Sequence, residues 1–332
     1  MIKRLSSIVG VSGFEDSVRG FIKNELREIE ADISVDRMGN LFVKRINGND
    51  YPTVVLSAHM DEVGFIITDI TDDGYLKFDK IGDINPCSLI SKRVKIGDIT
   101  GIIALKAIHL TTKEEREKPV KISDLFIDIG AKTKAEAEEV AEIGDYCAFV
   151  GVATDFGSNS LKGKALKSRV GCGILMDILK NNSYPNINLI YVFTVQNNVQ
   201  GRGAAVASNG IDNAEYLIVT DGFSANSDSN LTSGRGAAIS LTHNDTEKSK
   251  KLFDTIGDIA KNNAISIQCG FFSEKSDLEI YKARRNDIPS VAIGVPVKYI
   301  NTPTEIIENA DIKACYNIII GVLSEVSNGK NL

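Results

Sequence analysis

A long stretch that contains only strand-like segments interrupts a chain in which strands and helices otherwise alternate. Between Thr68 and Gly157 the sequence breaks into short period-two segments separated by Asp-Gly and Gly-Asp turns, a pattern typical of a small barrel or sandwich. On both sides of this stretch, apolar runs alternate with amphipathic helical segments. The chain is therefore constrained to a helix-covered sheet into which a compact β unit is inserted.

The alternating segments predict an α/β fold with a mainly parallel sheet covered by helices on both faces. We expect the sheet domain to comprise residues 1–67 and 158–332, and the β-rich insert to comprise residues 68–157. Helices are predicted over 15–30, 168–180, 247–263, 277–285 and 309–327, with a further helix starting in GRGAAVAS. Strands are predicted over 33–35, 41–44, 53–58, 188–195, 216–220, 265–269 and 290–295.

Composition narrows the class of partner. The 332 residues carry a formal net charge of −6 and no Lys/Arg-rich block, which disfavours binding to nucleic acid or to a membrane surface. The first twenty residues lack the apolar core of a secretory signal, and no run is long enough to span a membrane. The five cysteines are odd in number and form no CxxC pair, as expected of reduced thiols in a cytoplasmic protein.

Polar side chains follow two of the predicted buried strands at their carboxyl ends. The strand 53–58 leads into His59-Met60-Asp61-Glu62, and the strand 216–220 leads into Asp221. Because open α/β sheets place their chemistry at this edge, we expect His59 and Asp221 to share one rim. His59 could bind a metal through one ring nitrogen while a nearby carboxylate orients the ring; the alternative is a histidine held only by hydrogen bonds.

Other candidates have weaker patterns. Asn197 and Asn198 follow the strand 188–195 at the same rim, but amides are poor zinc ligands and cannot act as general bases. The two other histidines, His109 and His243, are interpreted as structural. The Gly-rich GRGAAVA segment is interpreted as close packing at a helix start, because a lone Gly-x-Gly is weak evidence for phosphate binding.

Several segments, in order along nearly the whole chain, resemble the family-42 metallopeptidases, which are the tetrahedral, glutamyl and deblocking aminopeptidases once also labelled endoglucanases. The segments are VGVSGFED, VVLSAHMDEVGFII, KIGDINP, KRVKIGDITG, KISDLFIDIGAKTKAEAEE, GKALKSRVGC, FTVQNNVQGRGA and VPVKYINTPTEII. The resemblance implies a hydrolase-like sheet with an inserted dimerisation domain, and dimers that assemble into hollow dodecamers. It also implies two zinc or cobalt ions at the sheet rim and a glutamate that deprotonates a metal-bound water.

Residue by residue, the resemblance implies that part of this metal site has changed. His59 and Asp61 match the family's first-metal histidine and its orienting carboxylate. Lys167 stands where the family has the aspartate that bridges both ions, and an ammonium would repel two dications. Asp221 lies one residue after the position of a first-metal aspartate, which Thr220 occupies.

The remaining family positions carry amides. Asn197 replaces the general-base glutamate, Asn198 a second-metal glutamate and Asn301 the second-metal histidine. These substitutions make joint electrostatic sense, because Lys167 could neutralise Asp61 or Asp221 in the absence of metal. We therefore expect a remodelled site with no cofactor, although His59 and Asp221 could hold a single weakly bound zinc or cobalt ion.

Three functional hypotheses follow from this reading. The first is a pseudo-peptidase that binds a peptide or small molecule, or that serves as a subunit of a homo-oligomer, from dimer to dodecamer, with or without an active paralogue. The second is an aminopeptidase with an altered or single-metal site, in which an acid such as Glu62 replaces the missing base. The third is a glycoside hydrolase or another binding activity on the same scaffold, for which the sequence offers no acidic pair.

Overall fold

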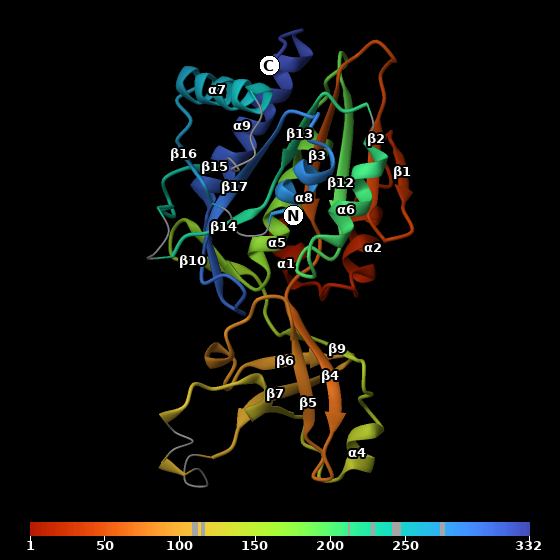
Figure 1. Ribbon diagram of the computed structural model, residues 1–332, viewed down its shortest axis with the longest axis vertical. Helices are drawn as coiled ribbons and strands as arrows, with labels where there is room; N and C mark the ends of the chain where they lie inside the picture. The colour runs from red at the N-terminus through yellow and green to blue at the C-terminus, as the bar shows by residue number, and fades with distance from the viewer. Residues whose placement is uncertain (108–111, 114–116, 212, 227–229, 241–246, 273–275) are drawn as a thin grey trace.

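A computed structural model describes the chain from residue 1 to 332 except 108–111, 114–116, 212, 227–229, 241–246 and 273–275. Figure 1 shows an elongated molecule with a helix-covered sheet at one end and a smaller β barrel at the other. His109 and His243 lie outside the described residues. Within the described part of the chain, no helix combines the length and apolarity that crossing a membrane would take.

A twelve-stranded mixed sheet forms the larger part. Its centre consists of four adjacent parallel strands, in the order β12 (Asn188–Thr194), β3 (Thr53–His59), β13 (Tyr216–Val219) and β17 (Ser290–Lys298). Antiparallel pairing extends it through β2 (Leu41–Arg45) and β1 (Asp32–Val35) on one side, and through β18 (Glu305–Glu308), β11 (Ser160–Gly163) and β10 (Thr154–Phe156) on the other. Two further strands pair with β17, namely β14 (Gly222–Ser224) and β15 (Ala237–Ser240), and β16 (Ile267–Gly270) pairs with β15.

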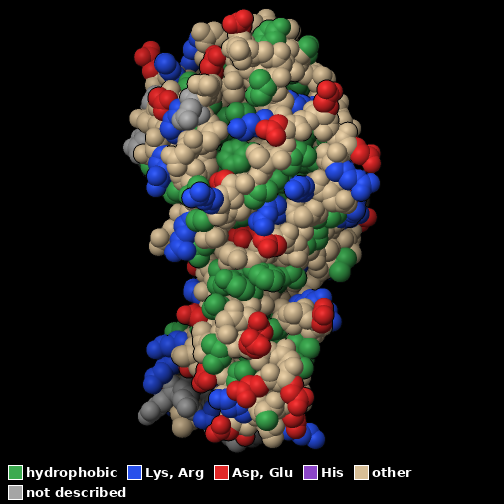
Figure 2. Space-filling model, turned by 90° about the vertical axis from the view of Figure 1, so that its right-hand side faces the viewer, with side chains coloured by type: hydrophobic (Ala, Val, Ile, Leu, Met, Phe, Trp, Pro, Cys, Tyr) green, Lys and Arg blue, Asp and Glu red, His purple; other side chains and the backbone are tan. Residues whose placement is uncertain are grey.

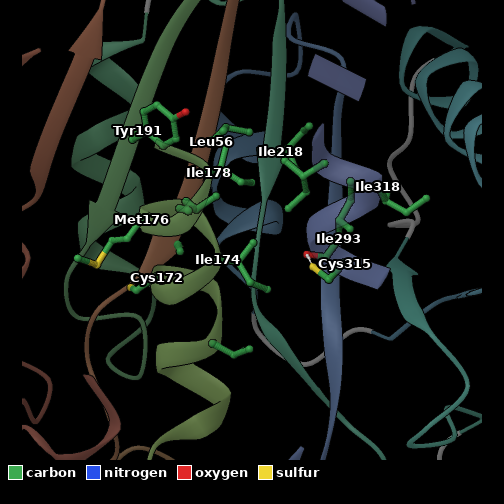
Figure 3. Packing of buried hydrophobic residues seen from close by; sticks show 14 of the residues in the cluster. Leu56, Cys172, Ile174, Met176, Ile178, Tyr191, Ile218, Ile293, Cys315 and Ile318 are labelled. Carbon is green, nitrogen blue, oxygen red and sulfur yellow. Dashed lines mark hydrogen bonds between the residues drawn. The ribbon is translucent and has the colours of Figure 1, made fainter. Parts of the chain in front are cut away.

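Helices cover both faces of this sheet, as the sequence predicts. One face packs against α1 (Ile2–Ser7), α2 (Asp16–Glu25), α5 (Leu166–Asn181), α7 (Glu247–Asn262) and α9 (Asn309–Ser327). The other packs against α6 (Arg202–Ala207) and α8 (Asp277–Arg284), with the short helix η4 (Ser208–Gly210) following α6. Figure 3 shows Leu56, Ile218 and Ile293 of three central strands packed against α5 and α9. Side-chain alternation within each strand divides the core into these two layers.

One helix is shorter than predicted. The pattern suggested a helix over 15–30, whereas α2 ends at Glu25. Residues 27–30 carry three charged side chains and a single apolar one, Ile29, which offers too little packing to hold another turn.

The insert is a closed six-stranded barrel with its own core. Its strands are, around the barrel, β4 (Gly64–Ile70), β5 (Leu76–Ile81), β8 (Leu125–Asp128), β7 (Ile99–Leu105), β6 (Arg93–Ile96) and β9 (Tyr146–Phe149). Short helices lie at η1 (Pro86–Ser88), η3 (Ile122–Asp124) and α4 (Lys134–Glu138). The expected boundaries of 68–157 differ from these positions, because β4 starts right after the His59–Glu62 segment and β10 pairs within the large sheet.

A narrow waist joins the two parts, and hydrophobic side chains gather there on the face shown in Figure 2. Phe14 of the sheet domain stacks on Tyr146 of the barrel, with ring centroids 5.3 Å apart. At Gly64, a Cβ atom would lie 2.5 Å from the carbonyl oxygen of Cys147 and 2.5 Å from a methyl group of Val11. Only glycine permits the backbones to approach this closely, so Gly64 keeps the barrel near the rim of the sheet.

Candidate functional site

The rim predicted from the sequence exists, and it is built by the carboxyl ends of three central strands. His59 is the last residue of β3 and pairs in register with Thr194 at the end of β12. Asp221 follows β13, and its Oδ1 lies 3.1 Å from Nε2 of His59. Parallel strands bring their carboxyl ends to one edge, which explains why residues far apart in the sequence meet here.

Both ring nitrogens of the buried His59 face acceptors. Nε2 contacts Asp221, while Nδ1 lies 3.1 Å from the backbone carbonyl of Asp61 and 3.3 Å from its Oδ1. A doubly protonated imidazole satisfies both sets of acceptors. Burial alone would lower the pKa of His59, but the charge of Asp221 and hydrogen bonds to both carboxylates outweigh it and raise the pKa to about 10.

Asp61 lies at the bottom of the site and is saturated with donors. Its carboxylate accepts hydrogen bonds from the backbone N–H groups of Asn197 (2.8 Å) and Asn198 (2.9 Å), and from Nδ2 of Asn198 (2.7 Å). The hydroxyl of Ser12 donates a further one. Burial opposes ionisation, but the hydrogen bond and charge of His59 and these donors hold the pKa of Asp61 well below its usual range.

Asp277 is a site residue that the sequence reading missed. Nδ2 of Asn197 donates to its Oδ1 at 2.8 Å, and the Thr194 hydroxyl donates to its Oδ2 at 2.5 Å. Burial raises the pKa of Asp277 above its usual range. Its signal in the sequence was ambiguous, because an acid just after Ser276 at a helix start is also a common capping pattern.

Lys167, in the first turn of α5, points at Asp221 rather than Asp61. Its Nζ lies 3.5 Å from Asp221 Oδ1, which also accepts the N–H of Gly222 at 2.7 Å. Burial would raise the pKa of Asp221, but the charges of Lys167 and His59 lower it. Within the described structure, Oδ2 of Asp221 and the hydroxyl of the buried Thr220 have no hydrogen-bond partner.

Asn301 is turned toward the barrel. Its Nδ2 donates to the carbonyl oxygen of Asp83 at 2.8 Å, and its backbone N–H donates to Glu305 at 2.7 Å. The other oxygen of Glu305 accepts the N–H of Lys167 at 2.8 Å. Burial raises the pKa of Glu305 to about 7. The sequence reading missed Glu305, whose only signal was its place in the family-like NTPTE segment.

Glu62 belongs to a different cluster, although it is adjacent to Asp61. Its two oxygens lie 2.6 and 2.7 Å from Nζ of Lys164, and Oε1 lies 3.4 Å from a guanidinium nitrogen of Arg169. Gly10 donates its N–H to the same carboxylate at 3.0 Å. Glu62 thus anchors the N-terminal segment beneath the rim.

A cavity of about 610 Å³ opens above these groups, between the rim and residues 80–83 at the end of β5 in the barrel. Four of the sequence-predicted positions line it, and Asp83 is the one acid among the described lining residues. The lining comprises Lys80, Gly82, Asp83, Lys167, Asn197, Asn198, Ser224, Asn226, Ile300 and Asn301. Nowhere among the described residues do three or more His, Cys, Asp or Glu side chains form a group that could hold a metal ion.

Comparisons with known proteins agree with the resemblance read from the sequence. The family model described as M42 glutamyl aminopeptidase matches residues 39–318. A protein of Acetivibrio thermocellus named "Putative aminopeptidase" is 31% identical over 335 residues, covering 96% of each chain.

Solved structures have the same fold. The TET aminopeptidase from the marine sediment archaeon Thaumarchaeota archaeon SCGC AB-539-E09 superposes with a TM-score of 0.90 at 27% identity, covering 99% of this chain and 97% of that one. The TET1 peptidase of Pyrococcus horikoshii superposes with a TM-score of 0.87 at 29% identity, covering 97% of this chain and 98% of that one. With its helix-covered sheet and inserted barrel, the chain belongs to the M42 glutamyl aminopeptidase family.

Proposed function

We propose that this chain is a non-catalytic member of its family, which binds a peptide or small molecule in the cavity at the former active centre. One observation carries the proposal: the ammonium group of Lys167 lies 3.5 Å from Asp221. The sequence resemblance aligns Lys167 with the aspartate that bridges both metal ions in the family. The fold and the cleft are retained, while the residues at the centre of the cleft have changed their chemistry.

Two divalent cations do not fit the groups present. A dication near Lys167 would meet a like charge, and repulsion of this kind is strong where water is scarce. His59 offers no lone pair, because both of its ring nitrogens are engaged with the carboxylates of Asp61 and Asp221. Amides such as Asn198 and Asn301 are poor zinc ligands, and both donate their Nδ2 groups to the protein.

A general base is also lacking at the family's position. Asn197 is committed to Asp277 through Nδ2, and an amide cannot take up a proton from water. Glu62, the acid that could have substituted, is held by Lys164 at 2.6 and 2.7 Å and does not line the cavity. These contacts support binding without hydrolysis.

The alternative is an aminopeptidase that uses one metal ion. The names of the relatives favour it, as does the buried Oδ2 of Asp221, which accepts no hydrogen bond within the described structure. To bind an ion, His59 would have to lose a proton and Lys167 would have to move away. A glycoside hydrolase would need two carboxyl groups facing the ligand, whereas Asp83 is the one acid among the described residues that line the cavity.

We also propose a homo-oligomeric assembly, with the barrel as its dimerisation domain. The TET1 peptidase of Pyrococcus horikoshii is described as assembling into a tetrahedron or a large octahedral shell, and this chain shares its fold over 97% of its length. An active paralogue is a further candidate subunit. Light scattering of the purified protein alone measures the size of the homo-oligomer, and light scattering of its mixture with such a paralogue measures mixed assembly.

Metal analysis combined with an aminopeptidase assay tests the proposal. The protein, purified without added metal, should contain far less than one zinc or cobalt ion per subunit. It should release no product from a panel of amino-acid anilides, with or without added zinc or cobalt. Two bound ions per subunit, or turnover that rises with added metal, would contradict the proposal and support the aminopeptidase alternative.

A restoration experiment adds a positive control. Combining Lys167→Asp, Asn197→Glu, Asn198→Glu and Asn301→His should bring back metal binding, measured as zinc per subunit after dialysis. If the fourfold variant folds but binds no zinc, the site has changed beyond these four positions.

A further inference from the structure

The acids of the site are turned away from the cavity. Asp61 and Asp221 are 0% and 1% exposed, and neither lines the cavity. The two lysines Lys167 and Lys80 do line it, together with the single acid Asp83, whose side chain is 82% exposed at the outer edge. Lys80 and Asp83 form an ion pair at 3.9 Å, and Lys167 is the remaining charged side chain among the described lining residues, so the lining carries a net positive charge.

The amides add acceptors. Nδ2 of Asn198 donates to the carboxylate of Asp61, and Nδ2 of Asn301 donates to the carbonyl of Asp83. Because a carboxylate and a carbonyl can only accept, the orientation of each amide is fixed. Each Oδ1 is therefore the atom left to accept a hydrogen bond from a ligand in the cavity.

A positive amine, such as the free amino terminus of a peptide, has a poor environment here. It would approach Lys167, while Asp221 is buried and shared between His59, Lys167 and the N–H of Gly222. The one acid among the described lining residues, Asp83, is paired with Lys80 at 3.9 Å. An anionic oxygen would be attracted to the same lysine. A neutral amide N–H suits the Asn198 and Asn301 oxygens without bringing a positive charge.

We propose that the cleft binds a ligand that presents a carboxylate to Lys167 and a neutral amide N–H to the asparagine oxygens. Acylated amino acids and acylated short peptides with a free carboxylate have this chemistry. This inference rests on the proposed non-catalytic binding function and specifies its ligand class.

Four versions of one dipeptide test the preference on the full-length protein by isothermal titration calorimetry. The probes are acetyl-Ala-Leu, which carries only the carboxylate, Ala-Leu-amide, which carries only the ammonium, Ala-Leu with both charges, and acetyl-Ala-Leu-amide with neither. Acetyl-Ala-Leu should bind at least about tenfold more tightly than Ala-Leu-amide. The affinity should fall as salt increases, because an ion pair with Lys167 contributes to it.

Lys167→Met removes the ammonium at similar side-chain volume and should abolish the preference for acetyl-Ala-Leu. Lys80→Met should partly reduce the preference for acetyl-Ala-Leu. A thermal melt shows whether Lys167→Met folds, and if it does not, Lys80→Met tests the preference in its place. The control Lys95→Met, an exposed position on β6 in the barrel, should leave all four affinities unchanged.

The outcomes separate the two proposals. Tighter binding of Ala-Leu-amide would overturn the preference for a carboxylate and leave non-catalytic peptide binding intact, whereas hydrolysis of Ala-Leu would overturn the non-catalytic function itself. Absence of binding by all four probes at millimolar concentration would overturn both.

Discussion

Asp61 and Glu62 are neighbours in the sequence, yet they belong to two buried clusters of different character. Glu62 holds Lys164 through both of its oxygens, at 2.6 and 2.7 Å, and Arg169 is the other cation near it. Asp61 and Asp221 instead share His59 and several backbone donors, and Lys167 approaches Asp221 only to 3.5 Å. The first cluster is a structural anchor, whereas the second distributes its charge and faces a cavity.

The comparison teaches that the two lysines are not equivalent, although only two residues separate them. Lys164 is the main counter-ion of one carboxylate, while Lys167 is one of several groups that stabilise Asp221. Replacing either lysine by methionine keeps an unbranched side chain of similar volume and removes the ammonium group with its hydrogen bonds. The same substitution should therefore have different costs at the two positions.

Lys164→Met should be the most damaging change. It leaves the buried Glu62 with Arg169 at 3.4 Å as its nearest cationic partner. Breaking a buried ion pair by removing one partner costs about 3–5 kcal/mol. Urea denaturation should show the free energy of unfolding falling by that amount. The control Lys3→Met removes an exposed ion pair with Asp155 and should change stability by less than about 1 kcal/mol. Equal losses in both variants would mean that Glu62 is not an anchor.

Glu305 contacts the second cluster and should make stability depend on pH. Its pKa is raised by burial from its usual value of 4.5 to about 7, so the folded state holds a proton that the unfolded chain releases. The stabilisation is complete below pH 4.5 and is lost as pH rises through about 7. Glu305→Gln removes this dependence, so the variant should gain about 3 kcal/mol relative to wild type between pH 4.5 and pH 8.

The measurement is a series of urea denaturations of both proteins across that pH range. The constant cost of altering the hydrogen bonds from Lys167 and Asn301 cancels in the comparison, because only the change with pH is used. A stability difference that stays flat with pH would show that Glu305 ionises normally in the folded protein.

Lys167→Met should lower the free energy of unfolding by only about 1 kcal/mol, because Asp221 keeps its contacts with His59 at 3.1 Å and with the N–H of Gly222 at 2.7 Å. Thermal and urea denaturation of both variants, Lys167→Met and Lys164→Met, give the ratio between their losses in the free energy of unfolding. A loss as large as that of Lys164→Met would make Lys167 a structural residue and weaken its assignment to the cleft.

Much of the fold could be read from the sequence, because hydrophobic periodicity reports burial directly. The helix predicted over 309–327 matches α9 from Asn309 to Ser327, and the continuous apolar run at 53–58 is the central strand β3. The sequence could not fix where the barrel begins. Gly64 starts β4 because of a close approach to Val11 and Cys147, which no local pattern encodes.

The site was predictable where a polar residue ends a strand, as at His59 and Asp221, because the topology of a parallel sheet brings strand ends together. Asp277 and Glu305 were missed because their roles depend on tertiary contacts with Asn197 and Lys167. Adjacency to Asp61 makes Glu62 a candidate base in the sequence, whereas in the structure both of its oxygens contact Lys164.

The smallest expected effect concerns the backbone that presents the second cluster. Gln196 has a φ of 54°, a left-handed conformation that costs a non-glycine residue about 1 kcal/mol. Its N–H donates to Glu15 at 2.9 Å, and the next two N–H groups, those of Asn197 and Asn198, reach Asp61. Gln196→Gly should raise the free energy of unfolding by about 0.5–1 kcal/mol, less than the full strain because glycine also gains freedom in the unfolded chain.

Ser91→Gly is the matched control away from the cleft, because Ser91 in the barrel has a φ of 64°. Its free energy of unfolding should rise by a similar amount. If Gln196→Gly destabilises while Ser91→Gly stabilises, the side chain of Gln196 contributes more to the rim than its strained backbone costs.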